Sequence, residues 1–224
     1  MVVSEKFKYV YLDNPKTATV STVKMLLEND PSARKRIFNI QGKEIGFRDH
    51  TTALALKNKL GNDLYQYKTF SFIRNPISKM VSAYFFYKNG KPITKGNKNP
   101  WPTRVRVLFA RLFPFSLWSI LYPYRSNLYH LADENGRLLV DYIGLYERLD
   151  SDLTDILNEI GVDFSISELP HENRSTHKHY ERYLNNPFLK IILLKKLRRD
   201  IGFYEFIVNQ PGIFKSKKYN RIKF

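Results

Sequence analysis

Two stretches of the chain share one pattern, an apolar run of strand length, a break, and then apolar residues at helical spacing. The first run extends from Lys6 to Asp13, and a helical pattern follows it from Thr17 to about Asn29. The second run extends from Lys68 to Ile73 and is interrupted by Arg74-Asn75-Pro76, after which Pro76 suits the first turn of a helix. Each stretch therefore predicts a strand, a loop and a helix, in that order.

Other parts of the chain continue this alternation. A third strand is expected from Leu138 to Tyr146, and a helix from Asp49 to Leu60 would have His50 at its entrance. Further helices are expected from Leu153 to Ile160 and from about Asn186 to Asp200. Such alternation favours an α/β fold in which a central parallel sheet is flanked by helices and binds ligands beyond the carboxyl ends of its strands.

The amino-acid composition indicates which ligands the chain attracts and excludes some kinds of chemistry. The chain has 37 Lys and Arg against 21 Asp and Glu, and the net charge of +16 predicts attraction to phosphate, sulfate, nucleic acid or an anionic membrane. Cysteine is absent, which excludes disulfides, thiolate metal sites and a cysteine nucleophile. A hydrophobic content of 43% argues against a disordered chain, so we expect a single domain over residues 1–224 with a mobile tail at about 215–224.

The positive charge is concentrated between Leu64 and Ala132, where there are eleven Lys and Arg and no acidic residue. This stretch contains a basic aromatic insertion at about 88–126, in which Trp101 to Tyr124 interleaves arginines with large apolar side chains. It is too broken and too basic to span a bilayer. It predicts either helices that pack on the core and line an acceptor cleft, or an interfacial segment on an anionic membrane.

The amino terminus lacks a long apolar run, so neither a signal peptide nor a membrane anchor is predicted there. We therefore expect a cytoplasmic protein. On the second interpretation of the insertion, it would also be peripheral at the inner membrane surface.

The first loop and the start of its helix carry a lysine and several hydroxyls, in the sequence PKTATVST. Between a strand and a helix, unpaired amide hydrogens and the positive end of the helix dipole form an anion site. The residues expected in that site are Lys16, Thr17, Ala18, Thr19, Val20, Ser21 and Thr22. The alternative is that the hydroxyls only cap the helix. The glycines of a Walker A loop are missing, which disfavours an ordinary ATP or GTP hydrolase.

Arg74, at the end of the second strand, and Ser82, eight residues later, form a second candidate anion site. A guanidinium fork with one added hydroxyl suits a phosphate monoester. An anion that contacts both must lie beside the first turns of the helix. The alternative for Arg74 is a surface ion pair.

The segments PKTATVST and IRNPISKMVSAY together resemble two motifs of the sulfotransferase superfamily, specifically of the carbohydrate sulfotransferases related to the heparan and chondroitin enzymes and their bacterial homologues. Further similarities, among them RDHTTALALKNKLG and RRDIGFYEF, lie in order over about residues 7–206. The resemblance implies a P-loop-like three-layer fold. It also implies transfer of a sulfuryl group from 3′-phosphoadenylyl sulfate to a saccharide or glycoconjugate hydroxyl, which leaves adenosine 3′,5′-bisphosphate.

The same resemblance implies roles for individual residues. The first loop would hold the 5′-phosphosulfate, and Arg74 and Ser82 would bind the 3′-phosphate. Lys16 and the amides at the helix start are placed to stabilise charge on the leaving phosphate. His50 is the expected base for the acceptor hydroxyl, with Asp13 and Glu147 as alternative bases. The alternative for His50 is that it caps its own helix or binds a neighbouring carbonyl.

The sequence also gives expectations about the acceptor, about nucleic acid and about metals. The acceptor is expected to be an acidic glycan or a lipid-linked sugar, and no nucleic-acid partner is expected. No metal is expected, because His171, His177 and His179 fit no familiar ligand spacing and sulfuryl transfer needs no metal. A small-molecule kinase and a basic nucleic-acid-binding module are the competing functions.

Overall fold

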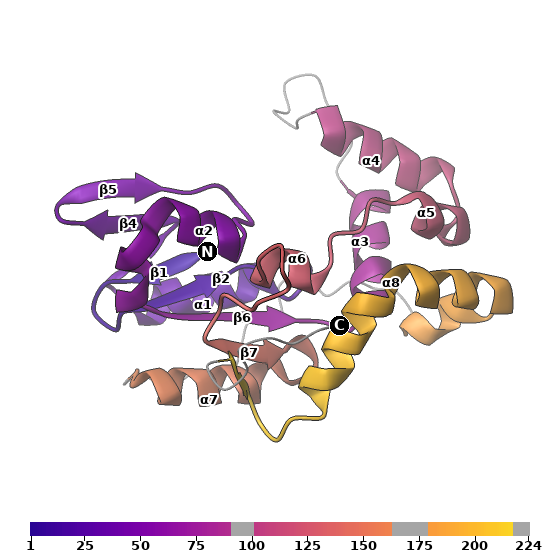
Figure 1. Ribbon diagram of the computed structural model, residues 1–224. Helices are drawn as coiled ribbons and strands as arrows, with labels where there is room; N and C mark the ends of the chain where they lie inside the picture. Colours follow the sequence, from indigo (N-terminus) through magenta and orange to yellow (C-terminus); the bar gives the residue numbers. More distant parts are fainter. Residues whose placement is uncertain (91–100, 163–178, 217–224) are drawn as a thin grey trace.

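The structure, a computed structural model, describes residues 1–90, 101–162 and 179–216 (Figure 1). Three parallel strands form its centre: β2 (Tyr9–Leu12), β6 (Lys68–Ile73) and β7 (Tyr142–Leu145). All three lie within the stretches that the apolar pattern predicted. The helices α1 (Thr19–Asn29) and α3 (Pro76–Lys88) follow β2 and β6, which confirms both strand-loop-helix units.

Within the described ranges the sheet has six strands, in the order β3-β1-β2-β6-β7-β8. The sequence predicts a parallel sheet, but the observed sheet is parallel only at its centre. The outer strands β1 (Val2–Ser4), β3 (Ala33–Lys35) and β8 (Phe214–Lys215) pair antiparallel with their neighbours. Between β1 and β2 there is only the turn at residues 5–8, and a parallel pair would need a crossover of about a dozen residues.

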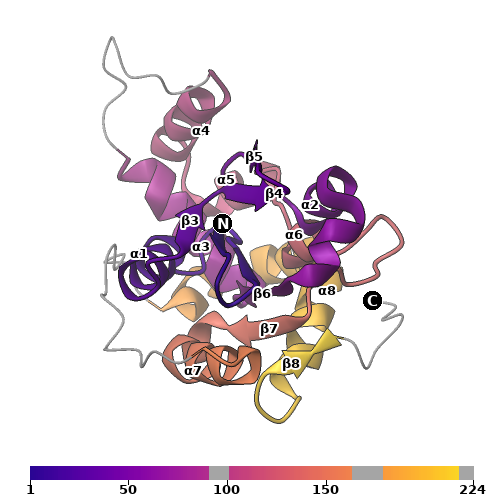
Figure 2. The same ribbon diagram turned by 90° about the vertical axis from the view of Figure 1, so that its left-hand side faces the viewer.

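Helices cover both faces of the sheet, so the predicted three-layer α/β fold is confirmed (Figure 2). One layer contains α1 and α7 (Leu149–Ile160), and the other contains α2 (Ala53–Leu60), α6 (Asn127–Leu131) and the second half of α8 (Pro187–Val208). On β2, Tyr9 and Tyr11 pack in the first layer, while Val10 and Leu12 pack in the second. This alternation follows from the two-residue period of a strand.

A helical lobe, formed by α4 (Trp101–Leu112), α5 (Phe115–Leu121) and the first half of α8, packs on α3 beside the sheet (Figure 1). Met80 of α3, Trp118 of α5 and Leu193 of α8 are completely buried in the apolar cluster that joins these helices. In the described ranges, no helix has both the length and the apolar content to cross a bilayer.

Several boundaries differ from the predicted ones. α7 begins at Leu149 instead of Leu153, and α8 continues past Asp200 to Val208 because Phe203 and Ile207 extend its buried stripe. Lys215, expected in a tail, lies in β8, and residues 217–224 are outside the described ranges. Besides the outer strands β1, β3 and β8 and the helix α6, the elements not predicted are the hairpin strands β4 (Ile37–Ile40) and β5 (Lys43–Gly46) and the 3-10 helices η1 (Gly61–Gln66), η2 (Tyr146–Arg148) and η3 (Tyr180–Leu184).

The close packing of β7 against its neighbours gives a test of the central sheet. A Cβ added at Gly144 would lie 2.8 Å from Cδ1 of Phe72 and 3.0 Å from Cβ of Asp152, both of which are buried. Gly144→Ala should therefore lower the free energy of unfolding by about 1–3 kcal/mol, a loss of about 3–10 °C in Tm by thermal unfolding. Gly46→Ala is the matched control, because no atom lies within 4 Å of its added Cβ. Equal Tm values for the two variants would contradict the packing described here.

Candidate active site

The loop between β2 and α1 leaves the start of the helix open to an anion. Lys16 and Ala18 have left-handed backbone angles, with φ of 70° and 55°, and Ala18 is the N-cap residue. No side chain caps α1, because the hydroxyls of Thr17 and Thr19 donate instead to the carbonyl of Asn14, at 2.7 and 3.0 Å. The interpretation of these hydroxyls as helix caps is therefore wrong. The first-turn amides remain available for a ligand.

Lys16 contributes an ammonium group that no carboxylate pairs with among the residues that the structure describes. Its Nζ lies 4.2 Å from the ring centre of Phe86, in the geometry of a cation–π contact. Burial, and to a lesser degree the charge of Arg74, lower the pKa of Lys16 to about 8. The negative charge of an anion in the loop would oppose the effects of burial and of Arg74 and raise the pKa of Lys16 again. Binding of an anion is therefore electrostatically favourable at this site.

Arg74 connects the two predicted anion sites. Its side chain is 8% exposed, its Nε donates to Oγ of Ser78 at 2.9 Å, and one terminal nitrogen donates to the carbonyl of Lys16 at 3.2 Å. The guanidinium also stacks on Tyr146, 4.1 Å from the ring centre. These contacts replace the surface ion pair considered from the sequence. Ser82 lies one turn beyond Ser78 on α3 and is 5% exposed.

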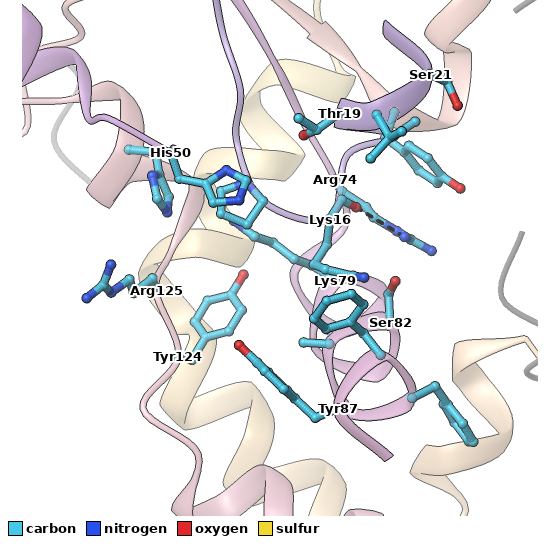
Figure 3. A pocket seen from close by; sticks show the side chains of 18 of the residues that line it. Lys16, Thr19, Ser21, His50, Arg74, Lys79, Ser82, Tyr87, Tyr124 and Arg125 are labelled. Atoms are coloured by element: carbon cyan, nitrogen blue, oxygen red, sulfur yellow. Dashed lines mark hydrogen bonds between the residues drawn. The ribbon is translucent and has the colours of Figure 1, made fainter. Parts of the chain in front are cut away.

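These residues surround a cavity of about 1420 Å³ (Figure 3). Of the residues predicted from the sequence, Thr17 and Thr22 do not line it, because both are completely buried behind the loop. The others do: Lys16, Ala18, Thr19, Val20, Ser21, His50, Arg74 and Ser82. The structure therefore brings the first loop, the second motif and the candidate base to one cavity.

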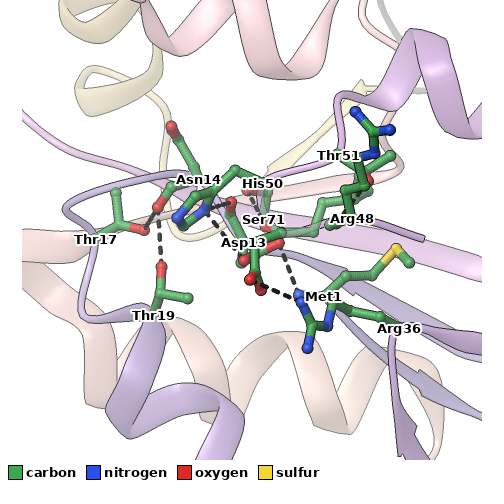
Figure 4. A network of polar contacts seen from close by, with 12 residues as sticks. Met1, Asp13, Asn14, Thr17, Thr19, Arg36, Arg48, His50, Thr51 and Ser71 are labelled. Carbon is green, nitrogen blue, oxygen red and sulfur yellow. Dashed lines mark hydrogen bonds and ion pairs between the residues drawn. The ribbon is translucent and has the colours of Figure 1, made fainter. Parts of the chain in front are cut away.

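His50 faces this cavity and is held from behind by Asp13 (Figure 4). Its Nδ1 lies 3.1 Å from the Asp13 carboxylate and 3.1 Å from the Asp13 carbonyl. Because both partners are acceptors, Nδ1 carries the proton and Nε2 remains the basic nitrogen. The helix α2 is capped by Thr52, which accepts from the amide of Ala55, so His50 does not cap its own helix. The carbonyl contact that was the other alternative for His50 is present.

Asp13 is a buried partner of His50. Its carboxylate is 4% exposed, and its second oxygen lies 2.7 Å from the amino group of Met1. Burial alone would raise the pKa of Asp13, but the bonds from His50 and from the amino group lower it to about 2. The hydrogen bond that His50 donates to Asp13, followed by the negative charge of Asp13, raises the pKa of His50 despite burial. Asp13 is thus positioned to orient the imidazole and to stabilise the imidazolium.

Glu147, the other alternative base, lies at the start of α3. One of its oxygens accepts from the amide of Asn75 at 2.9 Å, just before the first helical residue. Glu147 and Asp150 are the acidic residues among the described lining of the cavity, against six Lys and Arg. The cavity therefore has a strongly positive lining.

Sequence reasoning missed a buried network beneath the loop. Lys79 is 3% exposed, and its Nζ donates to the side-chain oxygens of Asn14 at 2.9 Å and of Asn127 at 3.1 Å. Burial lowers the pKa of Lys79 to about 8. The amide group of Asn127 donates to the carbonyl of Arg74 and to the buried carboxylate of Asp200, at 3.0 and 3.1 Å. No local signal in the sequence indicated this network, because its members come from separate segments of the chain.

The outer half of the cavity is formed by tyrosines and arginines, most of them from the insertion at about 88–126. Its helices pack on α3, as one of the two interpretations of the insertion predicted, although the individual lining residues were not predicted. Tyr87 comes from the end of α3, Tyr122 and Tyr124 follow α5, and Arg125 lies beside them (Figure 3). His130 is 3% exposed, and burial lowers its pKa to about 3, so it is neutral at physiological pH. Rings and cations at this position can hold the face of a sugar and an anionic group.

The histidine loop weighed as a metal site falls almost entirely outside the described residues, including His171 and His177. His179 is described, and its Nδ1 lies 3.4 Å from a carboxylate oxygen of Glu181. It does not line the cavity.

Residues 1–207 match the family model described as the sulfotransferase family, a range that includes every described residue of the cavity. An uncharacterized protein of Archaeoglobus fulgidus is 32% identical over 115 residues, which cover 49% of this chain and 82% of that protein. No solved structure was found to match the chain.

The contact between Asp13 and His50 predicts a measurable pKa. Asp13→Asn removes the negative charge that stabilises the imidazolium, so the pKa of His50, followed by NMR titration of its ring protons, should fall. The resonance can be assigned with His50→Gln. Glu181→Gln is the matched control, because Glu181 neighbours His179 instead, and it should leave the pKa of His50 unchanged. An unchanged pKa of His50 in a folded Asp13→Asn variant would contradict the pairing.

Proposed function

The chain belongs to the sulfotransferase family, whose members transfer a sulfuryl group from 3′-phosphoadenylyl sulfate, and we propose that its acceptor is a hydroxyl of a saccharide or glycoconjugate. The observation that carries the assignment of the donor site is the contact between the two motifs, in which Arg74 donates to the Lys16 carbonyl. Two cationic side chains and an uncapped helix start thereby converge in one cavity. Such a group suits a ligand with two separate anionic groups.

Each residue of the site has a role in this proposal. Lys16 and the amides of Thr19 to Ser21 hold the 5′-phosphosulfate, and Arg74 and Ser82 hold the 3′-phosphate. Ser78 and Tyr146 fix the Arg74 guanidinium, so that little side-chain entropy is lost on binding. Both Lys16 and Arg74 are held by neutral groups, which leaves their charges for the ligand.

The donor supplies a sulfuryl group that is joined to a phosphate as leaving group. Lys16, with the helix dipole, stabilises the negative charge that develops on the phosphate oxygen as the sulfur–oxygen bond breaks. Nε2 of His50 accepts the proton of the acceptor hydroxyl as the oxygen of that hydroxyl forms its bond to sulfur. Asp13 holds the ring in the tautomer that leaves Nε2 basic and compensates the charge of the imidazolium.

The outer half of the cavity supports a sugar acceptor. Tyr87, Tyr122 and Tyr124 offer ring faces, and Arg106 and Arg125 offer charge next to them. Arg106 donates to the hydroxyl of Tyr87 at 3.4 Å, which keeps the guanidinium beside that hydroxyl. An acidic glycan or a sugar attached to a phosphorylated lipid would supply the complementary anion.

The donor site can be tested without knowledge of the acceptor. Adenosine 3′,5′-bisphosphate should raise Tm more than ADP, AMP or ATP at fixed salt. At about 100 times the dissociation constant the stabilisation is about 2.7 kcal/mol, or about 5–10 °C for a chain of this size. A preference for ATP would favour the kinase alternative. Equal, salt-sensitive shifts with all four would favour general binding of nucleic acids.

Arg74→Ala should abolish the preference for the bisphosphate over ADP, because the two ligands differ by the 3′-phosphate that Arg74 is proposed to hold. The measurement is the ratio of the two dissociation constants by calorimetry. Arg125→Ala is the matched control, since it removes a cation from the outer half of the same cavity and should keep the preference. A preference that survives Arg74→Ala would place the 3′-phosphate elsewhere.

His50→Ala should separate chemistry from binding. Loss of a general base is expected to reduce turnover by about 10²- to 10⁴-fold, measured as bisphosphate released in the presence of acceptor glycans. The bisphosphate should still stabilise the variant to the same degree. Full turnover would exclude His50 as the base, and lost bisphosphate binding would show that its role is in the donor site.

A further inference from the structure

The outer surface of the helical lobe carries large apolar side chains that no other described part of the chain covers. On α4, Val105, Leu108 and Leu112 are 45%, 56% and 66% exposed. Their spacing of three and four residues places them on one face of the helix, opposite the buried Ala110. Singly exposed apolar residues are ordinary, but a complete stripe along a helix indicates an interaction surface.

Two neighbouring helices have the same feature. The exposed stripe of α5 is formed by Leu117, Ile120 and Leu121, which are 39%, 37% and 58% exposed. That of α8 is formed by Phe188, Ile191 and Ile192, which are 76%, 65% and 42% exposed. The helices α4 and α5 and the first half of α8 lie on the side of the molecule opposite the hairpin of β4 and β5 (Figure 1).

Hydrogen bonds fix the helices of the lobe relative to their neighbours. The ammonium of Lys196, on α8, donates to the carbonyls of Ser119, Ile120 and Tyr122 at 2.9, 2.8 and 2.7 Å, and so joins α8 to the end of α5. Arg111, on α4, donates to the carbonyl of Gly90 at 2.6 Å and so joins α4 to the region after α3. The three stripes therefore keep fixed positions relative to the cavity.

The charged residues of α4, α5 and the first half of α8 are all positive, because residues 101–131 and 182–199 contain no Asp or Glu. The exposed cations of the lobe include Arg111, Lys190, Lys195, Arg198 and Arg199. The nearest acidic residue before α8 in the chain is Glu181, on η3. Apolar stripes on helices that carry only cations match a lipid surface, with an apolar interior beneath negative headgroups. The cores of protein interfaces, in contrast, are depleted of lysine.

We propose that the helical lobe docks on an anionic membrane surface through the stripes of α4, α5 and α8, with the flanking lysines and arginines at the lipid phosphates. No helix in the described ranges could cross the bilayer, so this contact is peripheral. It goes beyond the proposed function, because it requires neither the donor nor the acceptor. Arg106 lies on α4 and lines the cavity, so docking would hold the outer half of the cavity near the headgroups.

The test is co-sedimentation of the full chain with vesicles of phosphatidylcholine, with and without phosphatidylglycerol. Binding is expected to the phosphatidylglycerol vesicles and to weaken with added salt. Replacing both Leu108 and Leu112 by serine should lower the partition coefficient about tenfold or more, since the side chains that enter the headgroup region are lost. Tyr65→Ser is the matched control, because Tyr65 is 79% exposed on η1, outside the lobe, and should leave binding unchanged.

Charge and insertion can be separated with Lys190→Glu combined with Lys195→Glu, which should weaken binding to anionic vesicles and leave the apolar stripes intact. The bisphosphate-induced rise in Tm should be unchanged in every lobe variant, which shows intact folding and keeps this test independent of the donor site. Absence of wild-type binding, or binding equal in the leucine variant, would overturn the proposal. A concentration-dependent dimer that the leucine variant abolishes would overturn it too, and would assign the surface to a second copy of the chain.

Discussion

The position of the donor loop depends on the buried ammonium of Lys79. It is held by the side-chain oxygens of Asn14 and Asn127, one at the start of the loop and the other at the start of α6. Asn127 in turn donates to the carbonyl of Arg74, so loop, helix and arginine share one set of bonds. A buried ammonium without its acceptors would cost several kcal/mol, and this penalty opposes any displacement of the loop. The geometry of the donor site is therefore fixed before a ligand arrives.

The same region is electrostatically incomplete without an anion. Lys16, Arg74 and Lys79 are partly or fully buried, and burial lowers the pKa of each. The nearby carboxylate of Asp200 is occupied by Tyr124 and Asn127. The phosphates proposed to bind here would supply the opposite charge that Lys16 and Arg74 lack among the described residues. Negative charge near the base is supplied separately, by Asp13, on the other side of His50.

The parts of the molecule that the sequence predicts are those with local signals. β6 and the start of α3 were located by an apolar run followed by Asn-Pro. The position of Ser82 on the same helix, eight residues after Arg74, was given by helical spacing. The antiparallel edges of the sheet were not predicted, because strands of two or three residues such as β1 and β8 have no distinct period. The buried network of Lys79 could not be predicted from the sequence for another reason. Asn14 and Asn127 are 113 positions apart, and no pattern along the chain indicates that one lysine bonds to both.

The helix α3 joins the chemistry to the lobe. Ser82, on its cavity side, is proposed to bind the donor, while Met80 and Tyr84 pack in the apolar cluster shared with α5 and α8. Tyr87, near its end, reaches the outer half of the cavity. Because one short helix contacts the proposed donor site, the apolar cluster of the lobe and the outer half of the cavity, it fixes the distance between that donor site and the outer surface of the lobe. If the lobe rests on a membrane, the acceptor hydroxyl must come to His50 from the headgroup layer, and a sugar on a lipid carrier satisfies that geometry better than a free glycan.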